Sequence, residues 1–450
     1  MQNSNLPVAI IGGGPVGLAA AAHLTKKDIP FLLFEAGDSV GRNFLSWGHV
    51  RVFSPWRYNL DKVARELLLQ TDWLEPDPES LPTGKELVDE YFHPFSQLPS
   101  IKPHIKLNAK VLSIGRKGFD KMKTWGRNEK PFSIQVEENG LVNYYEASAV
   151  IDSSGTWNQP NPIGSGGVMA QGEQELAKHI YYGIPDVKHQ ELERYKNKHV
   201  VVVGGGHSAI NALLDLADVQ NLYPETKISW ILRKPDISQV YGGQEADELQ
   251  ARGTLGIRIE NLVNSGRLHI YTPYHILRLS EQETGIEIQG ELKGELVKIG
   301  EVDEIISNTG ARPNLDMIRE IRTDLDSSLE SVSDLAELID PNIHSCGTVR
   351  PHGEAELRHP EEDFYIVGSK SYGRAPTFLM ATGYEQVRSI VAYLSGDKEG
   401  AKRVELDLPQ TGVCSSSLNL KSGSSCCAPE PVEVESMERS AQGTVSGCCG

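Results

Sequence analysis

The chain has 450 residues, enough for two or three domains, and its 39% hydrophobic and 23% charged content is ordinary for a globular protein. A formal net charge of −17 argues against a nucleic-acid partner, because phosphate binding needs a basic face. No basic segment precedes the first apolar run, and three adjacent glycines interrupt that run. Both features disfavour a signal peptide or a membrane span. We therefore expect a cytoplasmic enzyme with no nucleic-acid or membrane partner.

A short apolar run followed by glycines opens the chain. Residues 7–11 (PVAII) predict a buried parallel strand, Gly12, Gly14 and Gly17 give the spacing G-x-G-x-x-G, and residues 18–24 favour a helix. In this arrangement the first glycine permits a tight turn, the second lets a pyrophosphate approach the backbone, and the third lets helix and strand pack closely. The pattern predicts a dinucleotide-binding turn.

The next predicted strand, residues 30–35 (PFLLFE), ends in an acid. Glu35 lies 18 residues beyond Gly17, where a carboxylate can bind both ribose hydroxyls. Because an acid disfavours a 2′-phosphate, the first site favours FAD or NAD over NADP.

A second motif of an apolar strand followed by glycines occurs in mid-chain, with the spacing G-x-G-x-x-A. It consists of Gly204, Gly206 and Ala209, with Ser208 where a helix would begin. The strand that follows, residues 227–235 (KISWILRKP), contains Arg233 and Lys234 at its end instead of an acid. This cationic pair would accommodate the 2′-phosphate of NADPH, although the two side chains could also be solvated charges at a strand end.

Three later segments each run from an apolar strand into a glycine: residues 149–162 with Gly155, 301–314 with Gly310, and 363–373 with Gly368. The first two suit backbone crossings between domains. The third leads into residues 375–394, which have apolar residues at helical spacing and could direct N–H groups at a polar ring edge. We count Gly155, Gly310, Gly368 and Tyr372 among the candidate cofactor contacts.

These motifs together resemble the flavoproteins with two dinucleotide-binding domains, and the flavin-containing monooxygenases above all, over about residues 5–400. The resemblance implies an α/β fold of two Rossmann-like domains, with FAD and NADPH as cofactors and the NADPH domain inserted in the FAD domain. It implies that reduced flavin activates O2 and transfers one oxygen atom to a small-molecule substrate, so no catalytic triad is expected. We expect FAD-binding segments at 1–165 and 301–402, an NADPH domain at 166–300 and a flexible tail at 403–450.

The stretch after Glu35 (EAGDSVGRNFLSWGHVRVFSPW) resembles the family segment that contacts flavin and covers its face. The residues carried over from this resemblance are Gly41, Arg42, Trp47, Arg51 and Ser54. The alternative for the tryptophans is ordinary packing in a core or lid.

The six cysteines lie late in the chain, and the first 345 residues contain none. A C-x-x-C dithiol of the thioredoxin-reductase kind is therefore absent from the nucleotide domains, which favours oxygen over a dithiol as electron acceptor. Beyond Cys346, the remaining cysteines lie in a tail rich in Ser, Gly and Glu, for which we expect disorder. They are Cys414, Cys426, Cys427, Cys448 and Cys449.

Residues 343–389 and this tail are similar to flavoprotein monooxygenases of bacterial arsenic-resistance operons. The resemblance implies oxidation of trivalent arsenicals to the pentavalent form. Thiolates bind such thiophilic centres, so Cys346 is the candidate catalytic and substrate-binding residue, and Cys414, Cys426 and Cys427 are further substrate ligands. Cys346 could instead be a small buried hydrophobe, and the paired cysteines could form a disulfide, carry a lipid or bind a metal adventitiously.

Two alternatives for the activity stay open: N- or S-oxygenation of a small organic substrate, and an NADPH-dependent flavoprotein reductase. The spacing of His352 and His359 fits no standard metal site, so no resident metal is expected. We expect His352 to line the flavin cavity and His359 to lie in a surface loop. Homodimerisation is left open.

Overall fold

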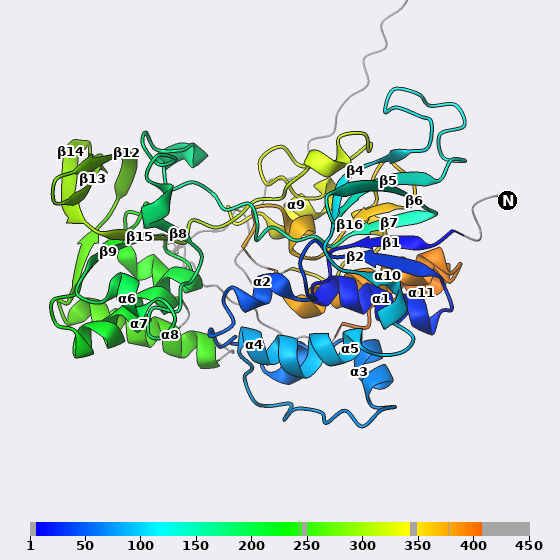
Figure 1. The fold of residues 1–450 in the computed structure, drawn as a ribbon, viewed down its shortest axis with the longest axis horizontal. Helices are drawn as coiled ribbons and strands as arrows, with labels where there is room; N and C mark the ends of the chain where they lie inside the picture. Colours follow the sequence, from blue (N-terminus) through cyan, green and yellow to red (C-terminus); the bar gives the residue numbers. More distant parts are fainter. Residues whose placement is uncertain (1–5, 243, 245–249, 343–348, 377, 407–450) are drawn as a thin grey trace, which may run out of the picture. The chain divides into compact units, whose positions relative to one another are not determined.

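The fold is built on two five-stranded parallel sheets (Figure 1). The structure is a computed structural model and describes residues 6–242, 244, 250–342, 349–376 and 378–406. One contact unit, Met1–Ser416, contains both sheets. The α/β fold with Rossmann-type parallel sheets agrees with the sequence prediction. The central strands of each sheet are short and buried, as in parallel sheets generally, whereas several strands at the edges are only partly buried.

The first sheet has the order β16-β7-β1-β2-β3. Its strands are β1 (Val8–Ile11), β2 (Phe31–Phe34), β3 (Ile105–Lys106), β7 (Ala149–Asp152) and β16 (Phe364–Ile366). The helices of this part of the chain are α1 (Pro15–Lys26), α2 (Arg42–Leu45), α3 (Lys62–Leu68), α4 (Gly84–Leu87), α5 (His93–Ser96), α9 (Ser333–Ile339), α10 (Met380–Leu394) and α11 (Lys398–Lys402).

The second sheet has the order β11-β10-β9-β15-β8. Its strands are β8 (Ile180–Tyr182), β9 (His199–Val203), β10 (Lys227–Ile231), β11 (Leu268–Tyr271) and β15 (Glu304–Ser307). Its helices are α6 (Leu192–Tyr195), α7 (His207–Leu222) and α8 (Gln250–Asn264). Strand β15 lies beyond residue 300, where the sequence predicted the second domain to end. The predicted division into four segments stays a prediction.

The two sheets share one plan around their glycine turns. Strand β1 lies between β2 and β7, and β9 lies between β10 and β15. A glycine turn follows each central strand and leads into a long helix, α1 or α7. The repeated motif in the sequence therefore corresponds to a repeated strand–turn–helix unit.

The segments after β7 and β15 run side by side in opposite directions. An isolated bridge joins Pro160 to Ala311, and the Asn161 N–H donates to the Gly310 carbonyl at 2.9 Å. The hydroxyl of Thr309 donates to the Asn161 carbonyl at 2.6 Å. These are the two backbone crossings that the sequence predicted.

Each sheet is accompanied by a three-stranded antiparallel sheet. The first consists of β4 (Ala109–Arg116), β5 (Phe132–Glu138) and β6 (Leu141–Ala147), and the second of β12 (Tyr274–Gln282), β13 (Gly285–Leu292) and β14 (Glu295–Val302). The strands β6 and β14 are edge strands.

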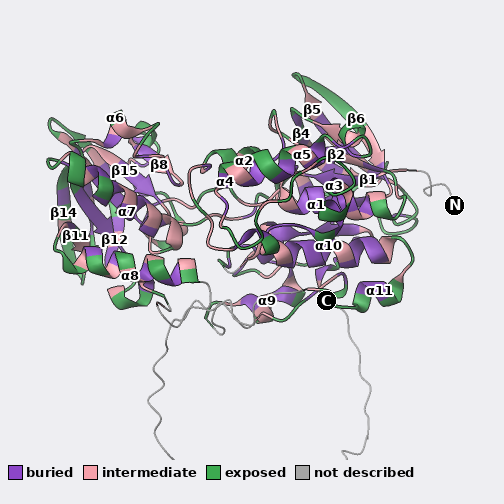
Figure 2. Cartoon of the chain, turned by 90° about the horizontal axis from the view of Figure 1, so that it is seen from below, coloured by how far each residue is buried: buried purple, intermediate pink, exposed green. Residues whose placement is uncertain are grey.

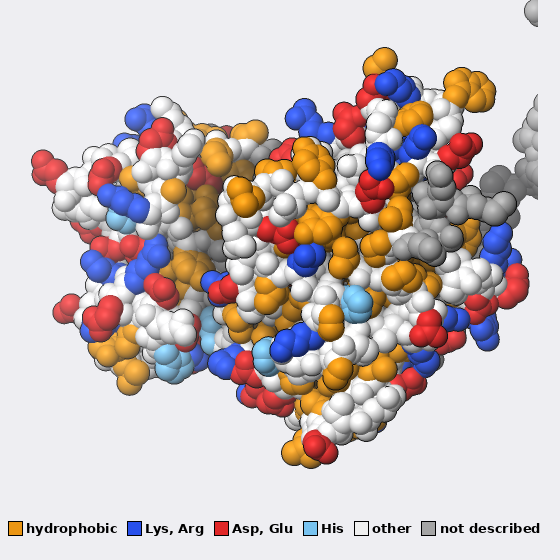
Figure 3. Space-filling model, turned by 45° about the vertical axis from the view of Figure 1, so that its right-hand side comes forward, with side chains coloured by type: hydrophobic (Ala, Val, Ile, Leu, Met, Phe, Trp, Pro, Cys, Tyr) orange, Lys and Arg blue, Asp and Glu red, His pale blue; other side chains and the backbone are white. Residues whose placement is uncertain are grey.

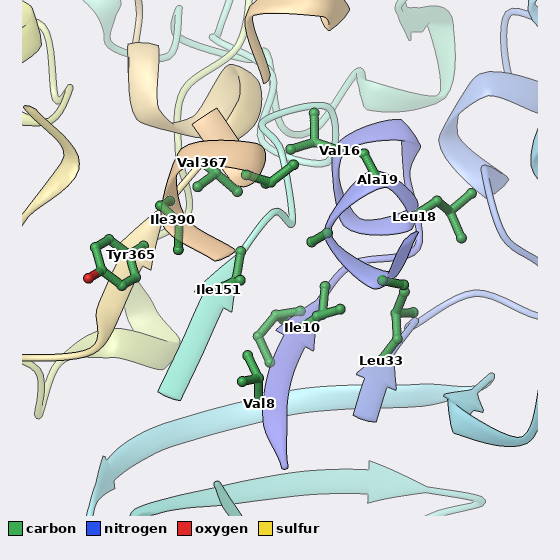
Figure 4. Close-up of a cluster of buried hydrophobic side chains, with 14 of the residues drawn as sticks. Val8, Ile10, Val16, Leu18, Ala19, Leu33, Ile151, Tyr365, Val367 and Ile390 are labelled. Carbon is green, nitrogen blue, oxygen red and sulfur yellow. The ribbon is translucent and has the colours of Figure 1, made fainter. Parts of the chain in front are cut away.

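The core around the first sheet lies between that sheet and the helices α1 and α10. Figure 4 shows Ile10, Leu33 and Ile151 on the strands, with Val16 and Ala19 of α1 packed above them. The alanines of α1 are fully buried, and their small side chains allow close approach of α10. Figure 2 shows the buried strands of both sheets in purple. Within the described ranges, no helix has the length and hydropathy to cross a membrane.

Candidate functional site

A cavity of about 480 Å³ is lined by the glycine turn after β1 and by several other segments. These include residues 41–59, the turn after β7, the first turn of α7, residues 368–369 and the start of α10 with the two residues before it. The predicted site residues on its wall are Gly12, Gly14, Glu35, Arg42, Trp47, Arg51, Ser54, Gly155, Ser208 and Gly368. Both glycine motifs therefore contribute to one cavity.

The three glycines of the first motif differ in their surroundings. Gly12 has a φ of +101°, and a Cβ there would lie 2.9 Å from the Ser153 carbonyl oxygen. A Cβ on Gly17 would lie 2.0 Å from the Gly12 carbonyl oxygen, whereas a Cβ on Gly14 would meet nothing within 4 Å. Gly12 thus makes the turn, Gly17 permits close packing, and Gly14 leaves open space at the cavity, as predicted.

The carboxylate of Glu35 is fixed against the glycine turn. It accepts the Gly13 N–H at 2.6 Å and the Gly37 N–H at 2.7 Å. These bonds hold the side chain at the end of β2 while it remains on the cavity wall. Since a carboxylate has about four acceptor positions, Glu35 can still accept from ribose hydroxyls.

Three helix N-termini reach the cavity without a side-chain cap. Helix α1 begins after Gly14, α7 after Gly206 and α10 after Leu379, and none of these N-cap residues makes a side-chain capping bond. The first N–H groups of a helix have no partner within the helix, and the helix dipole favours negative charge there. The cavity can therefore bind an anionic ligand such as a dinucleotide. Helix α10 begins at Met380, later than residue 375, where the predicted helical pattern starts.

The second glycine motif has the geometry of the first. Gly204 has a φ of +127°, and a Cβ there would lie 2.3 Å from the Asn308 carbonyl oxygen. A Cβ on Gly206 would meet nothing within 4 Å, and Ala209 is fully buried. Of this motif, Ser208 lines the cavity, but Gly204, Gly206 and Ala209 do not.

Aromatic side chains form much of the cavity wall, and only Trp47 among them was predicted. The rings of Trp47 and Trp157 have centroids 6.3 Å apart. Phe53 has its ring centroid 5.4 Å from that of His207 at the start of α7. The further aromatic residues on the wall are Phe44, Tyr58 and Phe378. These side chains make the wall largely apolar, which suits a flat cofactor and exclusion of water.

Buried polar side chains support the turn after β7, and the sequence analysis missed them. The Lys370 ammonium donates to Asp152 at 2.7 Å and to the Ser154 hydroxyl at 3.1 Å, and the Ser154 hydroxyl donates to Asp152 at 2.6 Å. Asp152 is fully buried, and Lys370 is 2% exposed. The three side chains thus fix the backbone that carries Gly155. The sequence does show a polar residue, Asp152, at the end of an apolar strand. Its partner Lys370 lies 218 residues away in the chain, so the pair could not be predicted from local spacing.

Several predicted site residues lie away from the cavity. Gly17 is buried in α1, Gly310 lies at the backbone crossing, and Tyr372 is buried with its ring against Phe378 at 5.3 Å. The exposed Arg233 and Lys234 follow β10. Cys346, Cys414, Cys426 and Cys427, the predicted thiolates, lie outside the described residues.

Neither predicted loop histidine lines the cavity. His352 is 3% exposed, and its Nε2 accepts from the Gln386 amide at 2.9 Å, while the Gln386 oxygen accepts the Gly368 N–H at 2.7 Å. His352 therefore stabilises the turn at Gly368 indirectly, through the side chain of Gln386. The surface position expected for His359 is wrong, because His359 is 8% exposed and packs beside Phe364.

His359 should make the protein sensitive to mild acid. Burial lowers the pKa of His359 to about 4, although the charges of Asp324 and Asp152 oppose this shift. In the unfolded chain the His359 imidazole binds a proton as the pH falls through about 6.5, whereas in the folded chain it stays neutral until about pH 4. Stability that is present above pH 6.5 is therefore lost as the pH falls toward 4. The contribution of His359 to the free energy of unfolding, measured by urea titration, should fall by about 3 kcal/mol over this range.

The matched variant is His359→Asn, which keeps an acceptor for the Asp324 N–H, bound at 3.2 Å. Its stability should vary less between pH 6.5 and 4 than that of the unmodified chain. Equal pH dependence of the two proteins would contradict a buried neutral His359.

Known proteins are similar to this chain in sequence and in fold. Residues 9–347 match the family described as pyridine nucleotide-disulphide oxidoreductase. The chain is 21% identical to ferredoxin–NADP reductase 2 of Shouchella clausii over 379 residues, 84% of this chain and 92% of that protein.

Solved structures share the fold at low identity. The bacillithiol disulfide reductase of Bacillus cereus has a TM-score of 0.65 and 17% identity, and 87% of this chain covers 99% of that one. The FAD-bound cadaverine monooxygenase of Erwinia amylovora has a TM-score of 0.61 and 12% identity, and 92% of this chain covers all of that one.

Proposed function

The chain belongs to the pyridine nucleotide-disulphide oxidoreductase family and is an oxidoreductase with FAD and NADPH as cofactors, and we propose that it is a monooxygenase of soft nucleophilic substrates. Trivalent inorganic or methylated arsenicals are the proposed substrates, each oxidised to its pentavalent form. One NADPH and one O2 are consumed per product, and the second oxygen atom leaves as water.

One observation carries this proposal: an aromatic cavity joins both glycine motifs in a chain without a cysteine in its first 345 residues. A dithiol acceptor of electrons is therefore absent from the segments that form the cavity, and oxygen is the acceptor that needs no further protein group. The apolar wall supports the choice, because oxygen transfer to substrate requires exclusion of water.

The residues around the first motif fit FAD. The open side of Gly14 and the uncapped start of α1 would receive the pyrophosphate, and Glu35 would accept from the ribose. The start of α10 would donate N–H groups, while Trp47 and Trp157 shield the cavity. When bound, FAD supplies hydride acceptance from NADPH and activation of O2.

NADPH is assigned to the second motif, with Ser208 at the start of α7 facing the shared cavity. Arg233 makes no hydrogen bond or ion pair within the described ranges, and the Lys234 ammonium has one weak contact, at 3.5 Å to the Gln239 carbonyl. Both side chains are thus available to a 2′-phosphate.

Replacing Arg233 with alanine should raise the KM for NADPH at least about tenfold and leave the KM for NADH unchanged. A hydrogen bond to a charged group contributes about 1.5–3 kcal/mol, and 1.4 kcal/mol corresponds to a factor of ten. The control is Arg319→Ala, which removes an exposed arginine outside the second glycine motif and the strand that follows it. Equal use of NADPH and NADH by the unmodified enzyme would contradict the assignment.

The arsenical substrate is tested through Cys346. A thiolate at this position would hold the arsenic atom, with the cysteines of the tail raising its local concentration. NADPH oxidation is measured with arsenite, methylarsenite, a thioether and a tertiary amine. Cys346→Ser should abolish most of the arsenical-dependent rate and keep bound FAD, whereas Ser345→Ala should keep both.

Removal of residues from Thr411 onward should weaken the apparent affinity for arsenicals and spare the slow background oxidation of NADPH. If both Cys346→Ser and the shortened chain kept full activity with arsenicals, the proposed arsenical substrate would be contradicted. An organic amine or sulfide would then be the favoured substrate.

A flavoprotein reductase is the second candidate, favoured by the ferredoxin–NADP reductases that match most of this chain. Such an enzyme passes electrons to a protein partner and does not need O2. The oxygen dependence of turnover separates the two candidates.

A further inference from the structure

A closed set of hydrogen bonds lies behind the wall of the cavity, around the side chain of Gln386 in α10. Gln386 and Ser371 are fully buried, His352 is 3% exposed, and none of the three lines the cavity. The proposed activity uses none of them. Buried polar side chains are stable only when their hydrogen bonds are made, so the partners of these groups determine their chemical state.

The backbone of Gly368 fixes the orientation of the Gln386 amide. The Gly368 N–H is donated at 2.7 Å, and only the amide oxygen of Gln386 can accept it. The amide nitrogen therefore points the other way, where it lies 3.0 Å from the Ser371 hydroxyl and 2.9 Å from Nε2 of His352. The Ser371 hydroxyl donates its own proton to the Gly368 carbonyl at 2.8 Å, so it accepts from Gln386.

One ring nitrogen of His352 is therefore an acceptor. Gln386 donates one amide proton to Ser371 and the other to Nε2 of His352, so Nε2 carries no proton. Nδ1 lies 3.2 Å from the Arg350 carbonyl, which can only accept, so Nδ1 carries the proton. The network is complete only when His352 is neutral and protonated at Nδ1.

This network joins two segments of the cavity wall. Gly368 follows β16, has a φ of +69° and lines the cavity together with Ser369. Gln386 belongs to α10, whose first residues, Met380 and Ala381, line the same cavity. The position of the Gly368 turn relative to the start of α10 therefore depends on the Gln386 amide.

A proton on Nε2 of His352 would break this arrangement. The charged ring would direct an N–H group at the N–H of the Gln386 amide, and two donors cannot bind each other. If the amide turned over to accept from the ring, its NH2 group would face the Gly368 N–H. In either orientation a buried donor loses its acceptor, which is unfavourable where water cannot replace it.

Burial favours the neutral state of the ring. Burial lowers the pKa of His352 below its usual value, and the charge of Arg350 acts in the same direction. The hydrogen bond to the Arg350 carbonyl and the negative charges of Glu356 and Glu385 oppose this shift. The ring of Tyr372, with its centroid 5.6 Å from that of His352, adds an aromatic neighbour. The imidazole is therefore neutral at neutral pH and takes up a proton only in acid.

We propose that neutral His352 is a positioning residue for FAD, which through Gln386 holds the Gly368 turn and α10 in the arrangement that binds the cofactor. A proton on Nε2 then loosens FAD, so FAD binding weakens reversibly in mild acid. His352 acts through Gly368 and not by contact, since it does not line the cavity. The inference rests on the assignment of FAD to this cavity and does not depend on which electron acceptor the enzyme uses.

The test is the Kd of FAD for the full chain, from fluorescence titration of the apoprotein between pH 8 and about pH 5. For the unmodified chain the Kd should be constant near neutral pH and rise about tenfold for each pH unit below the pKa of His352. His352→Gln keeps an amide oxygen that accepts from Gln386 and does not titrate in this range. It should bind FAD nearly as tightly at neutral pH and lose the acid dependence.

Two further variants separate this role from a purely structural one. His352→Leu offers no acceptor to Gln386 and should weaken FAD binding about tenfold at every pH. Surface histidines, such as those in pale blue in Figure 3, keep their contact with water. His93→Gln replaces an exposed histidine and should leave the pH dependence of the Kd unchanged. Far-UV circular dichroism at each pH identifies the range in which every variant stays folded.

A Kd that does not change with pH in the folded, unmodified chain would overturn the proposal, as would an equal pH dependence in His352→Gln. Failure of the unmodified chain to bind FAD at any pH would overturn both this inference and the cofactor assignment. Turnover without O2, which would contradict the monooxygenase, leaves the expected Kd values unchanged, so the two failures are distinguishable.

Discussion

Replacing Gly14 with alanine should leave the chain folded and weaken FAD binding about 10- to 100-fold. The backbone of Gly14 has a φ of −81°, which alanine adopts without strain, and the added Cβ would meet no protein atom within 4 Å. The methyl group instead occupies the space at the start of α1 that the pyrophosphate needs. Overpacking of this kind typically costs about 1–3 kcal/mol. The bound flavin is measured by its absorbance and by fluorescence titration of the apoprotein.

Alanine at Gly17 should have a different effect, because its Cβ would lie 2.0 Å from the Gly12 carbonyl oxygen. The helix α1 must then move away from β1, so this variant should unfold at lower temperature as well as lose flavin. Gly300→Ala is the control, since its Cβ also meets nothing within 4 Å and Gly300 lies in β14. Tight flavin binding by Gly14→Ala would contradict the assignment of FAD to this turn.

The second large effect is expected at Glu361, which lies between two buried arginines. Its carboxylate accepts from Arg116 at 2.8 Å and from Arg127 at 2.8 Å, and all three side chains are at most 1% exposed. Burial alone would raise the pKa of Glu361, but the hydrogen bonds from Arg127 and Arg116 lower it overall. The carboxylate is therefore charged in the folded chain.

Glu361→Gln should destabilise the chain by about 3–5 kcal/mol, because it leaves two buried guanidinium groups without a counter-charge. The free energy of unfolding is measured in urea at neutral pH. Glu362→Gln changes the neighbouring exposed side chain and should have almost no effect. Equal stability of the two variants would contradict the role given to the buried ion pairs.

The strand–glycine–helix units could be predicted from sequence because their parts are adjacent in the chain. Gly12, Gly14 and Gly17 have the geometry that the spacing requires, and the two crossings after β7 and β15 lie where glycines follow apolar strands. In each case the physical reason is local: a turn, a close backbone contact or an open side of a helix start.

The rest of the cavity depends on contacts between distant segments. Trp157 lies opposite Trp47, and Lys370 reaches Asp152 across 218 residues, so no local spacing indicates either pair. His359 was misplaced because a Pro-bounded loop with charged residues reads as exposed, whereas the chain folds it against Phe364. Periodicity describes one element at a time and does not show which elements meet.

The dependence of turnover on O2 tests the monooxygenase most directly. NADPH oxidation, O2 consumption and incorporation of labelled oxygen are followed together with methylarsenite as substrate. We predict one O2 consumed and one labelled oxygen atom in the product for each NADPH, with no substrate-dependent turnover under strict anaerobiosis. Substrate-dependent NADPH oxidation that continues undiminished without O2 would contradict the monooxygenase and favour the reductase.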